Sequence, residues 1–208
     1  MPQSFEATVR SVRPVGPDTV AVTFETPPSF AAAPGQFVRV SVDGESRFYT
    51  LSSPSTEGGF ELTVSVDPEG EVAPWLADRE SGDAVDVEGP FGRNYYEGES
   101  AAVVLAGGPG VGPAVGIAER VVRDGGRVAV VYRGDPVHED RLAGLAAADA
   151  PVFVVSDDAG LRAATTLAVA DVGGQPFVYG FADFVADAED ALEAAGADVA
   201  SAKVESFG

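Results

Sequence analysis

Hydrophobic and polar residues alternate along the first half of the chain, as in strands that bury one face. Pro34-Gly35 and Asp43-Gly44 are typical turn sequences between such strands. The predicted strands cover 5–12, 20–25, 36–42, the run that contains Arg47, 60–66 and 84–88, with a short helix near 74–79. Six short strands and one helix predict a six-stranded antiparallel Greek-key barrel.

The second half has a different pattern. Residues 101–106 are continuously apolar, as in a buried parallel strand, and apolar residues then recur at helical spacing after residue 113. Further strands are predicted at 128–132, 152–155, 177–179 and near 203, with helices after 140, near 161–170 and over 184–195. This alternation predicts a parallel sheet with helices on both faces. The polar stretch 94–100 is interpreted as a linker, which gives domains over 1–98 and 99–208.

A glycine-rich turn joins the apolar strand at 101–106 to the helix that follows it. This turn contains the glycines and the proline Gly107, Gly108, Gly110, Gly112 and Pro113. Glycines allow a ligand close to the backbone, and the first amides of a helix attract phosphate. We therefore predict a dinucleotide site here, with proline in the first helical turn, where its missing amide hydrogen costs little.

A second polar run lies within the strand-rich half. Arg47, Phe48, Tyr49, Thr50 and Ser53 place a fixed positive charge, aromatic rings and hydroxyls within seven positions. On a strand, Arg47 and Tyr49 share one face while Phe48 and Thr50 share the other. Guanidinium binds anions and phenol offers a stacking surface, so the run suits a flat aromatic ligand that carries phosphate. An ordinary hairpin strand with a surface arginine is the competing interpretation of the pattern alone.

This run resembles the flavin motif Arg-x-Tyr-Ser/Thr-x-x-Ser of the ferredoxin-NADP reductase family, and later segments resemble the same family in order, over nearly the whole chain. The resemblance implies that the chain binds FAD. It implies that Arg47 binds the pyrophosphate, that Tyr49 lies against the isoalloxazine and that Thr50 hydrogen-bonds near its reactive edge. The family has Gly-x-x-Ser/Thr on the pyrophosphate where this chain has Gly70, Val72 and Ala73, so the hydroxyl is lost.

On the nucleotide side the chain departs further from the family. Pro109 replaces the threonine of the Gly-Gly-Thr-Gly-x-x-Pro loop. The family's Cys-Gly-Pro near the nicotinamide reads Tyr179, Gly180 and Phe181, and two bulky rings are expected to reshape or obstruct that pocket. The resemblance makes Tyr179 a candidate catalytic residue in place of the cysteine.

The carboxyl end, Glu205 to Gly208, resembles the family's acidic-x-aromatic ending. The resemblance implies that Phe207 shields the flavin and makes Glu205 a candidate catalytic residue beside Thr50. A frayed terminus is the alternative. Asp157 and Asp158 stand where relatives that prefer NADP place residues for the 2'-phosphate, so we expect NADH rather than NADPH unless both belong only to the acidic surface.

The amino-acid composition excludes several classes of function and binding partner. The chain has 33 acidic residues against 13 basic ones and a net charge of -20, a field that repels nucleic acid and anionic membranes. It has no cysteine, which excludes disulfides and Cys-ligated iron–sulfur clusters within these residues. We expect no metal site, no membrane span and, since the start lacks a signal-peptide pattern, a cytoplasmic protein. The excess of acidic residues is typical of proteins from cells with a salt-rich cytoplasm. The alternative interpretation is that these residues only keep the protein soluble.

These observations favour a flavin-dependent oxidoreductase in which NAD(P)H reduces FAD and electrons pass singly to an acceptor, such as a ferredoxin or another redox chain. An FAD-binding electron-transfer or regulatory subunit that does not itself oxidise NAD(P)H is the alternative, and a flavin-free nucleotide-binding module is a third. His138, the single histidine, lies in a polar stretch and is expected to be solvated rather than catalytic.

Overall fold

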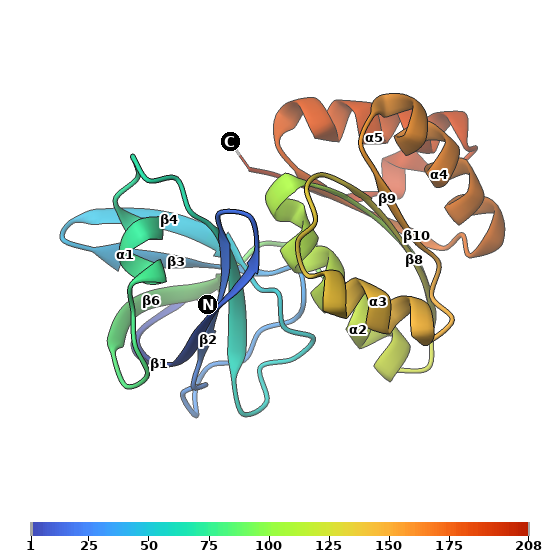
Figure 1. Cartoon of the computed structure of the whole chain (residues 1–208). Coiled ribbons are helices and arrows are strands. Elements are labelled where there is room, and N and C mark those ends of the chain that lie inside the picture. Colours follow the sequence, from blue (N-terminus) through green and yellow to red (C-terminus); the bar gives the residue numbers. More distant parts are fainter. Residues whose placement is uncertain (1, 208) are drawn as a thin grey trace.

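The first half of the chain folds into an antiparallel sheet in the computed structural model, which describes residues 2–207 (Figure 1). Its strands are β1 (Gln3–Gly16), β2 (Thr19–Phe24), β3 (Phe37–Val42), β4 (Glu45–Thr50), β5 (Phe60–Ser65) and β6 (Ala84–Phe91). They lie in the order β4-β3-β6-β1-β2-β5, and a bridge between Leu51 and Leu62 joins the two ends. The predicted six-stranded barrel is confirmed.

Alternating apolar side chains fill the barrel. Val38, Val40 and Leu51 are fully buried, and the rings of Phe24 and Phe60 stack with centroids 5.0 Å apart. The short helix α1 (Val72–Ala77) packs on β2, β3, β4 and β5. It begins two residues earlier than predicted. The β3–β4 turn follows the predicted Asp-Gly pattern, because both turn residues have positive φ, 50° and 89°.

The second half forms a parallel sheet in the order β11-β10-β7-β8-β9. Its strands are β7 (Ala101–Gly107), β8 (Arg127–Arg133), β9 (Val152–Val155), β10 (Gln175–Gly180) and β11 (Lys203–Ser206). The helices are α2 (Val111–Arg123), α3 (Glu139–Ala147), α4 (Asp158–Asp171) and α5 (Ala182–Ala194), with single 3-10 turns η1 (Gly108–Gly110) and η2 (Val199–Ser201). The predicted parallel sheet is confirmed.

The helices cover the two faces of this sheet in pairs. Apolar residues of α2 and α3 form one core with the sheet, and those of α4 and α5 form another. The N-cap position of α5 is Phe181, and Asp183 lies in its first turn. Gly196 follows the helix with a φ of +78°, as expected for a residue that ends one.

Helix α2 also packs against the barrel, and Figure 1 shows α2 and α3 on the side of the sheet that faces it. A Cβ atom at Gly112 would lie 2.9 Å from Cβ of Thr63 in β5, and one at Gly116 would lie 2.9 Å from the carbonyl oxygen of Ser52. Residues Val111–Ala118 are buried as a result. Helix α2 is therefore one of the elements that hold the two sheets against each other.

The connection between the sheets is fixed by side chains. Tyr96 is buried and its hydroxyl donates to Asp124, 3.1 Å away. The side-chain amide of Asn94 donates to the carbonyl of Val204 at 2.6 Å, and the ammonium of Lys203 donates to the carbonyl of Tyr95 at 2.7 Å. The predicted linker is thus attached to both α2 and β11.

Candidate functional site

Strand β4 presents Arg47 and Tyr49 on one face, as predicted. They pair with Val40 and Val38, whose buried side chains mark the inner face of the strand. The Arg47 side chain is 62% exposed and donates to its neighbour's carbonyl, Ser46, at 2.8 Å. Burial raises the pKa of Tyr49 to about 12, and the positive charge of Arg47 acts in the opposite direction. A guanidinium and a phenol therefore lie together at the rim of the barrel.

The other face of β4 carries Phe48 and Thr50. Phe48 is 60% exposed and lies edge-on against Phe37 and Phe91, with centroids 5.5 and 5.9 Å away. Thr50 is half-buried at the end of the strand and pairs with Phe37. The aromatic ring of Phe48 thus points away from the face that holds Arg47 and Tyr49.

The start of α1 lies beside that inner face. Ala73 and Tyr49 pack against the same barrel core, and Val72 belongs to it. The helix has no side-chain cap and no acidic residue in its first turn, while the Gly70 amide donates to the carbonyl of Asp67 at 2.9 Å. Unpaired first-turn amides and a guanidinium form a donor set that suits a diphosphate. The residues here fit an FAD pyrophosphate.

The hydroxyl groups that follow Thr50 have internal partners. The Ser53 hydroxyl accepts the amide hydrogen of Glu61 at 3.1 Å, and the buried Ser52 donates to the Glu61 carboxylate at 3.0 Å. These bonds join the end of β4 to β5.

Several glycines of the predicted nucleotide loop make room for the protein itself. A Cβ atom at Gly107 would lie 2.3 Å from the ring of Phe184, and one at Gly180 would lie 2.5 Å from it. A Cβ atom at Gly110 would lie 2.1 Å from the carbonyl oxygen of Tyr179. Gly108 has a φ of +52° and open space where a side chain would be. Of these four glycines, only Gly108 leaves room for a ligand at the position of its missing side chain.

The remaining loop positions begin α2. Gly112 contacts the barrel, and Pro113 is buried in the first turn, where the prediction placed it. Pro109 is half-buried within η1.

Tyr179 is completely buried. Its hydroxyl donates to the carbonyl of Asn94 at 2.6 Å, and a Cβ atom at Gly35 would lie 2.4 Å from the same oxygen. Burial, followed by the charges of Glu205 and Glu99, raises the pKa of Tyr179 well above its usual value. The ring connects the sheet to the linker and the barrel, and it offers no surface to a nucleotide.

The carboxyl end continues the sheet. Glu205 in β11 pairs with Tyr179 in β10, and burial raises the pKa of the Glu205 carboxyl. The Phe207 amide donates to the carbonyl of Gly180 at 2.9 Å, and its ring lies edge-on to Phe181, 6.3 Å away. The frayed-end alternative is therefore wrong for 205–207, and Gly208 lies outside the described residues.

Carboxylates gather at the ends of β8 and β9. Asp157 caps α4 by accepting the amide hydrogen of Gly160 at 2.7 Å. Asp158 pairs with Arg133, whose guanidinium also contacts Asp187 at 3.0 Å. Two carboxylates thus pair with one guanidinium at the end of β8, beside the strand that leads into the nucleotide loop, and Asp157 adds a third carboxylate next to Asp158 in the sequence.

The prediction for His138 is wrong, because its side chain is buried rather than solvated. It lies between the barrel and α3, with its Nε2 atom 2.7 Å from the Thr63 hydroxyl and its Nδ1 atom buried without a partner. Burial and then the charge of Arg141 lower its pKa to about 3. The contact joins positions 75 apart in sequence, and no local pattern marks it.

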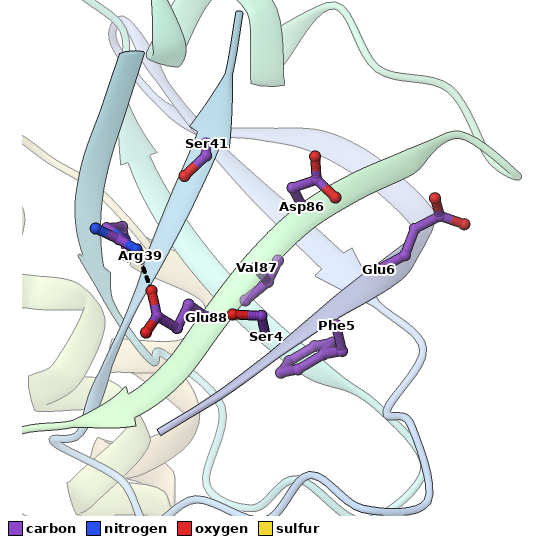
Figure 2. Close-up of a pocket in the computed structure, with 8 residues that line it drawn as sticks. All are labelled: Ser4, Phe5, Glu6, Arg39, Ser41, Asp86, Val87 and Glu88. Carbon is purple, nitrogen blue, oxygen red and sulfur yellow. Dashed lines mark hydrogen bonds and ion pairs between the residues drawn. The ribbon is translucent and has the colours of Figure 1, made fainter. Parts of the chain in front are cut away.

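A shallow hollow on the outside of the barrel contains none of the predicted site residues. Figure 2 shows its floor across β1, β6 and β3, with the Arg39 side chain directed at Glu88. Glu6 and Asp86 add two carboxylates to its rim. This hollow is separate from the inner face of β4.

Two features are absent from residues 2–207. No helix there is both long and apolar enough to cross a bilayer. No group of acidic and histidine side chains in the same range has the arrangement of a metal site.

The barrel is similar to known flavin domains. Residues 6–96 match the family model of the oxidoreductase FAD-binding domain. The chain is 30% identical over 184 residues to the ferredoxin reductase component of 3-ketosteroid-9-alpha-monooxygenase from Mycolicibacterium smegmatis, covering 79% of this chain and 52% of that protein. It is 38% identical over 109 residues to a probable dihydroorotate dehydrogenase B (NAD(+)) electron transfer subunit from Methanopyrus kandleri, covering 52% and 40%.

Solved structures extend the likeness to both sheets. The cytochrome P450 reductase of Amycolatopsis superposes with a TM-score of 0.81 at 25% identity, over 99% of this chain and 70% of that one. The ferredoxin-NADP+ reductase of Plasmodium falciparum has the same fold, with a TM-score of 0.81 at 12% identity over 98% and 96% of the two chains. Both reductase structures thus share the architecture of a barrel followed by a parallel-sheet domain. Residues 6–96 therefore belong to the oxidoreductase FAD-binding domain family, and the chain as a whole is similar to ferredoxin reductase-like oxidoreductases.

The chain spans 40% and 52% of the length of the two curated relatives named above. The activities and partners of those whole proteins are therefore only proposals for this chain.

Proposed function

We propose that this chain binds FAD and a reduced nicotinamide nucleotide, oxidises the nucleotide and passes electrons singly to a separate acceptor. The observation that carries the proposal is the placement of Arg47 and Tyr49 on the inner face of β4, beside the uncapped start of α1. That arrangement supplies a cation, amide donors and an aromatic surface in one place.

On the flavin side, Arg47 and the amides of Val72 and Ala73 bind the pyrophosphate, and Gly70 shapes the turn before them. Tyr49 lies against the ring system, with Thr50 at its reactive edge. Phe48 and Ser53 support the strand through the aromatic cluster and the bond to Glu61. Phe207, held beside Gly180 at the end of the sheet, would shield the flavin.

On the nucleotide side, Gly108 is the approach point for the nucleotide backbone, because space is open above it. Gly107, Gly110 and Gly180 keep the loop close to β10 and α5, while Gly112 and Pro113 seat α2. We propose the division into a flavin domain over 1–98 and a nucleotide domain over 99–208. The barrel core lies before the fixed linker and the two cores of the parallel-sheet half lie after it, apart from Tyr96 of the linker itself.

Bound FAD supplies the conversion between a two-electron donor and a one-electron acceptor. The protein orients the two cofactors and excludes water; no side chain needs to gain or lose a proton. Tyr179 and Glu205 then act by shaping the site, which agrees with the buried position of the Tyr179 ring.

We propose NADH as the donor. Arg133 is already paired with Asp158 and Asp187, so its positive charge is compensated by its own neighbours. With Asp157 close by, the net charge there is negative and disfavours a 2'-phosphate. A free ribose 2'-hydroxyl can donate to a carboxylate instead.

The proposed acceptor is a separate redox protein. Two of the similar proteins are named as parts of oxygenase or P450 systems. The chain has no cysteine to hold an iron–sulfur cluster of the Cys-ligated kind within its 208 residues.

Two measurements test the function. The apoprotein is titrated with FAD and followed by quenching of flavin fluorescence; failure to take up FAD contradicts the proposal. The FAD-loaded protein is then mixed rapidly with NADH or NADPH. Fast bleaching of flavin absorbance with NADH, and slower bleaching with NADPH, is expected. No bleaching with either nucleotide leaves the FAD-binding subunit as the correct description.

A further inference from the structure

One arginine of the nucleotide domain crosses the boundary between the two domains. Arg141 lies in α3 and its side chain is 12% exposed. Its Nε and Nη2 atoms donate to the two carboxylate oxygens of Glu119 in α2, at 2.7 and 2.8 Å. Its Nη1 atom donates to Glu61 in β5 at 2.9 Å, and Nη2 also donates to the carbonyl of Ser52 at 2.6 Å. One guanidinium thus binds α2 and the barrel at once.

The barrel groups that Arg141 contacts are themselves fixed to one another. The Ser52 hydroxyl donates to the same oxygen of Glu61 that receives Nη1, at 3.0 Å. The Ser52 amide donates to the Glu61 carbonyl at 2.9 Å. Arg13 contacts the other carboxylate oxygen of Glu61 at 3.3 Å. A movement of Arg141 is therefore transmitted to the backbone at Ser52.

Both ends of this network lie close in sequence to the proposed cofactor contacts. Ser52 is two residues after Thr50, at the proposed reactive edge of the flavin. Glu119 belongs to the helix that begins directly after the loop with Gly108. Gly116 of the same helix approaches the Ser52 carbonyl so closely that a Cβ atom would lie 2.9 Å from it. The guanidinium therefore links the chain just after Thr50 to the helix that follows the loop with Gly108.

We propose that Arg141 is a positioning residue for hydride transfer, an inference that rests on the proposed function. In that step the C–H bond of the reduced nicotinamide breaks, the hydride enters the flavin, and the nicotinamide is left oxidised. The reacting atoms must approach to about 3 to 3.5 Å, and a misplacement of about 1 Å can reduce the rate about a hundredfold. Arg141 touches neither cofactor in this scheme and acts through Ser52 and Glu119.

The test compares Arg141→Ala, Arg141→Lys and the control Arg127→Ala in the FAD-loaded full chain. Arg127 forms an exposed pair with Asp171 in the same domain. With saturating NADH, Arg141→Ala is expected to bleach the flavin about 10 to 100 times more slowly, with FAD affinity and the NADH concentration at half-maximal rate changed less than about threefold. The long-wavelength charge-transfer absorbance of the nicotinamide–flavin complex is expected to weaken. Arg141→Lys restores part of the rate, and Arg127→Ala matches wild type.

Glu119→Gln keeps the shape of the pair and serves if Arg141→Ala does not fold; a rate several times lower than wild type is expected. If the Arg141 variants fold and bleach at the wild-type rate, the positioning role is overturned and the proposed function stays intact. The same conclusion follows if only Glu119→Gln folds and it bleaches at the wild-type rate. If wild type itself is not bleached by NADH or NADPH, the proposed function and the positioning role both fail.

Discussion

Strand β4 and the loop after β7 use their distinctive residues differently. On the inner face of β4, Arg47 is exposed, and its partners among residues 2–207 are the carbonyl of Ser46 and the Glu45 carboxylate, 3.9 Å away. In the loop after β7, Gly107 and Gly110 are packed against Phe184 and the Tyr179 backbone. The strand offers groups to a ligand, whereas most of the loop's glycines are required by the fold.

The difference shows that a motif can contain residues of two kinds. Side chains with unused donors report on a ligand, and glycines pressed against neighbouring atoms report on packing. Among Gly107, Gly108, Gly110 and Gly180, Gly108 alone has open space at its Cβ position. Substitutions should therefore separate the two regions: changes in β4 should reduce cofactor affinity, and most changes in the loop should reduce stability.

The largest expected effect is the loss of stability in Gly110→Ala. Its new methyl group would lie 2.1 Å from the Tyr179 carbonyl oxygen, a backbone atom that cannot move away easily. We expect a loss of about 3 kcal/mol or more in the free energy of unfolding, measured by urea denaturation. Gly108→Ala, with a φ of +52° but open space, should lose only about 1 to 2 kcal/mol. Equal losses would contradict the contrast between the two positions.

Arg47→Ala should weaken FAD binding about 10- to 100-fold, because a hydrogen bond to a charged group contributes about 1.5 to 3 kcal/mol. Fluorescence titration of the apoprotein with FAD measures the effect. Arg39→Ala is the matched control: Arg39 lies on the neighbouring strand and pairs with Glu88 in the outer hollow. If both variants bind FAD equally well, β4 does not hold the pyrophosphate.

The boundary between the regions should respond to pH through His138. Its pKa is lowered to about 3 in the folded state, against about 6.5 when unfolded. The contribution of neutral His138 to stability is therefore complete at a pH above the unfolded-state pKa. It is lost as the pH falls from that pKa toward the folded-state pKa. Between pH 6 and 5, wild type should lose about 1 kcal/mol more than His138→Asn in urea denaturation. Asparagine tolerates the residue's positive φ of 55°. Parallel losses would show that His138 does not titrate as stated.

The smallest expected effect is that of Tyr179→Phe. The variant removes one hydrogen bond to the Asn94 carbonyl and should cost about 1 kcal/mol, seen as a small drop in melting temperature. The rate of flavin bleaching by NADH should stay near that of wild type. A strong fall in that rate at normal stability would return Tyr179 to the catalytic residues.

The strand and helix pattern was predictable because it is local. Period-two alternation located the barrel strands, and the apolar run at 101–106 located the central strand of the sheet. The shared face of Arg47 and Tyr49 also followed from strand geometry. The excess of acidic residues still supports only a prediction of adaptation to high salt.

The contacts between domains were not predictable in this way. His138 and Arg141 lie in a polar stretch that resembles a solvated helix start, yet they contact Thr63 and Ser52 across 75 and 89 positions. Tyr179 was predicted as a candidate catalytic residue because it stands where the family has a cysteine. Only the folded chain brings Asn94 and Gly35 to its hydroxyl.

Helix α2 has one further consequence, for engineering new combinations of domains. Its Val111–Ala118 segment is enclosed by its own sheet on one side and by the barrel on the other, with glycines at the points of closest contact. A hybrid that joined this sheet to a foreign barrel would keep the helix but lose the surface shaped to receive it. Such a hybrid needs matching small residues on the new partner, so transplantation should succeed only when both halves are exchanged together.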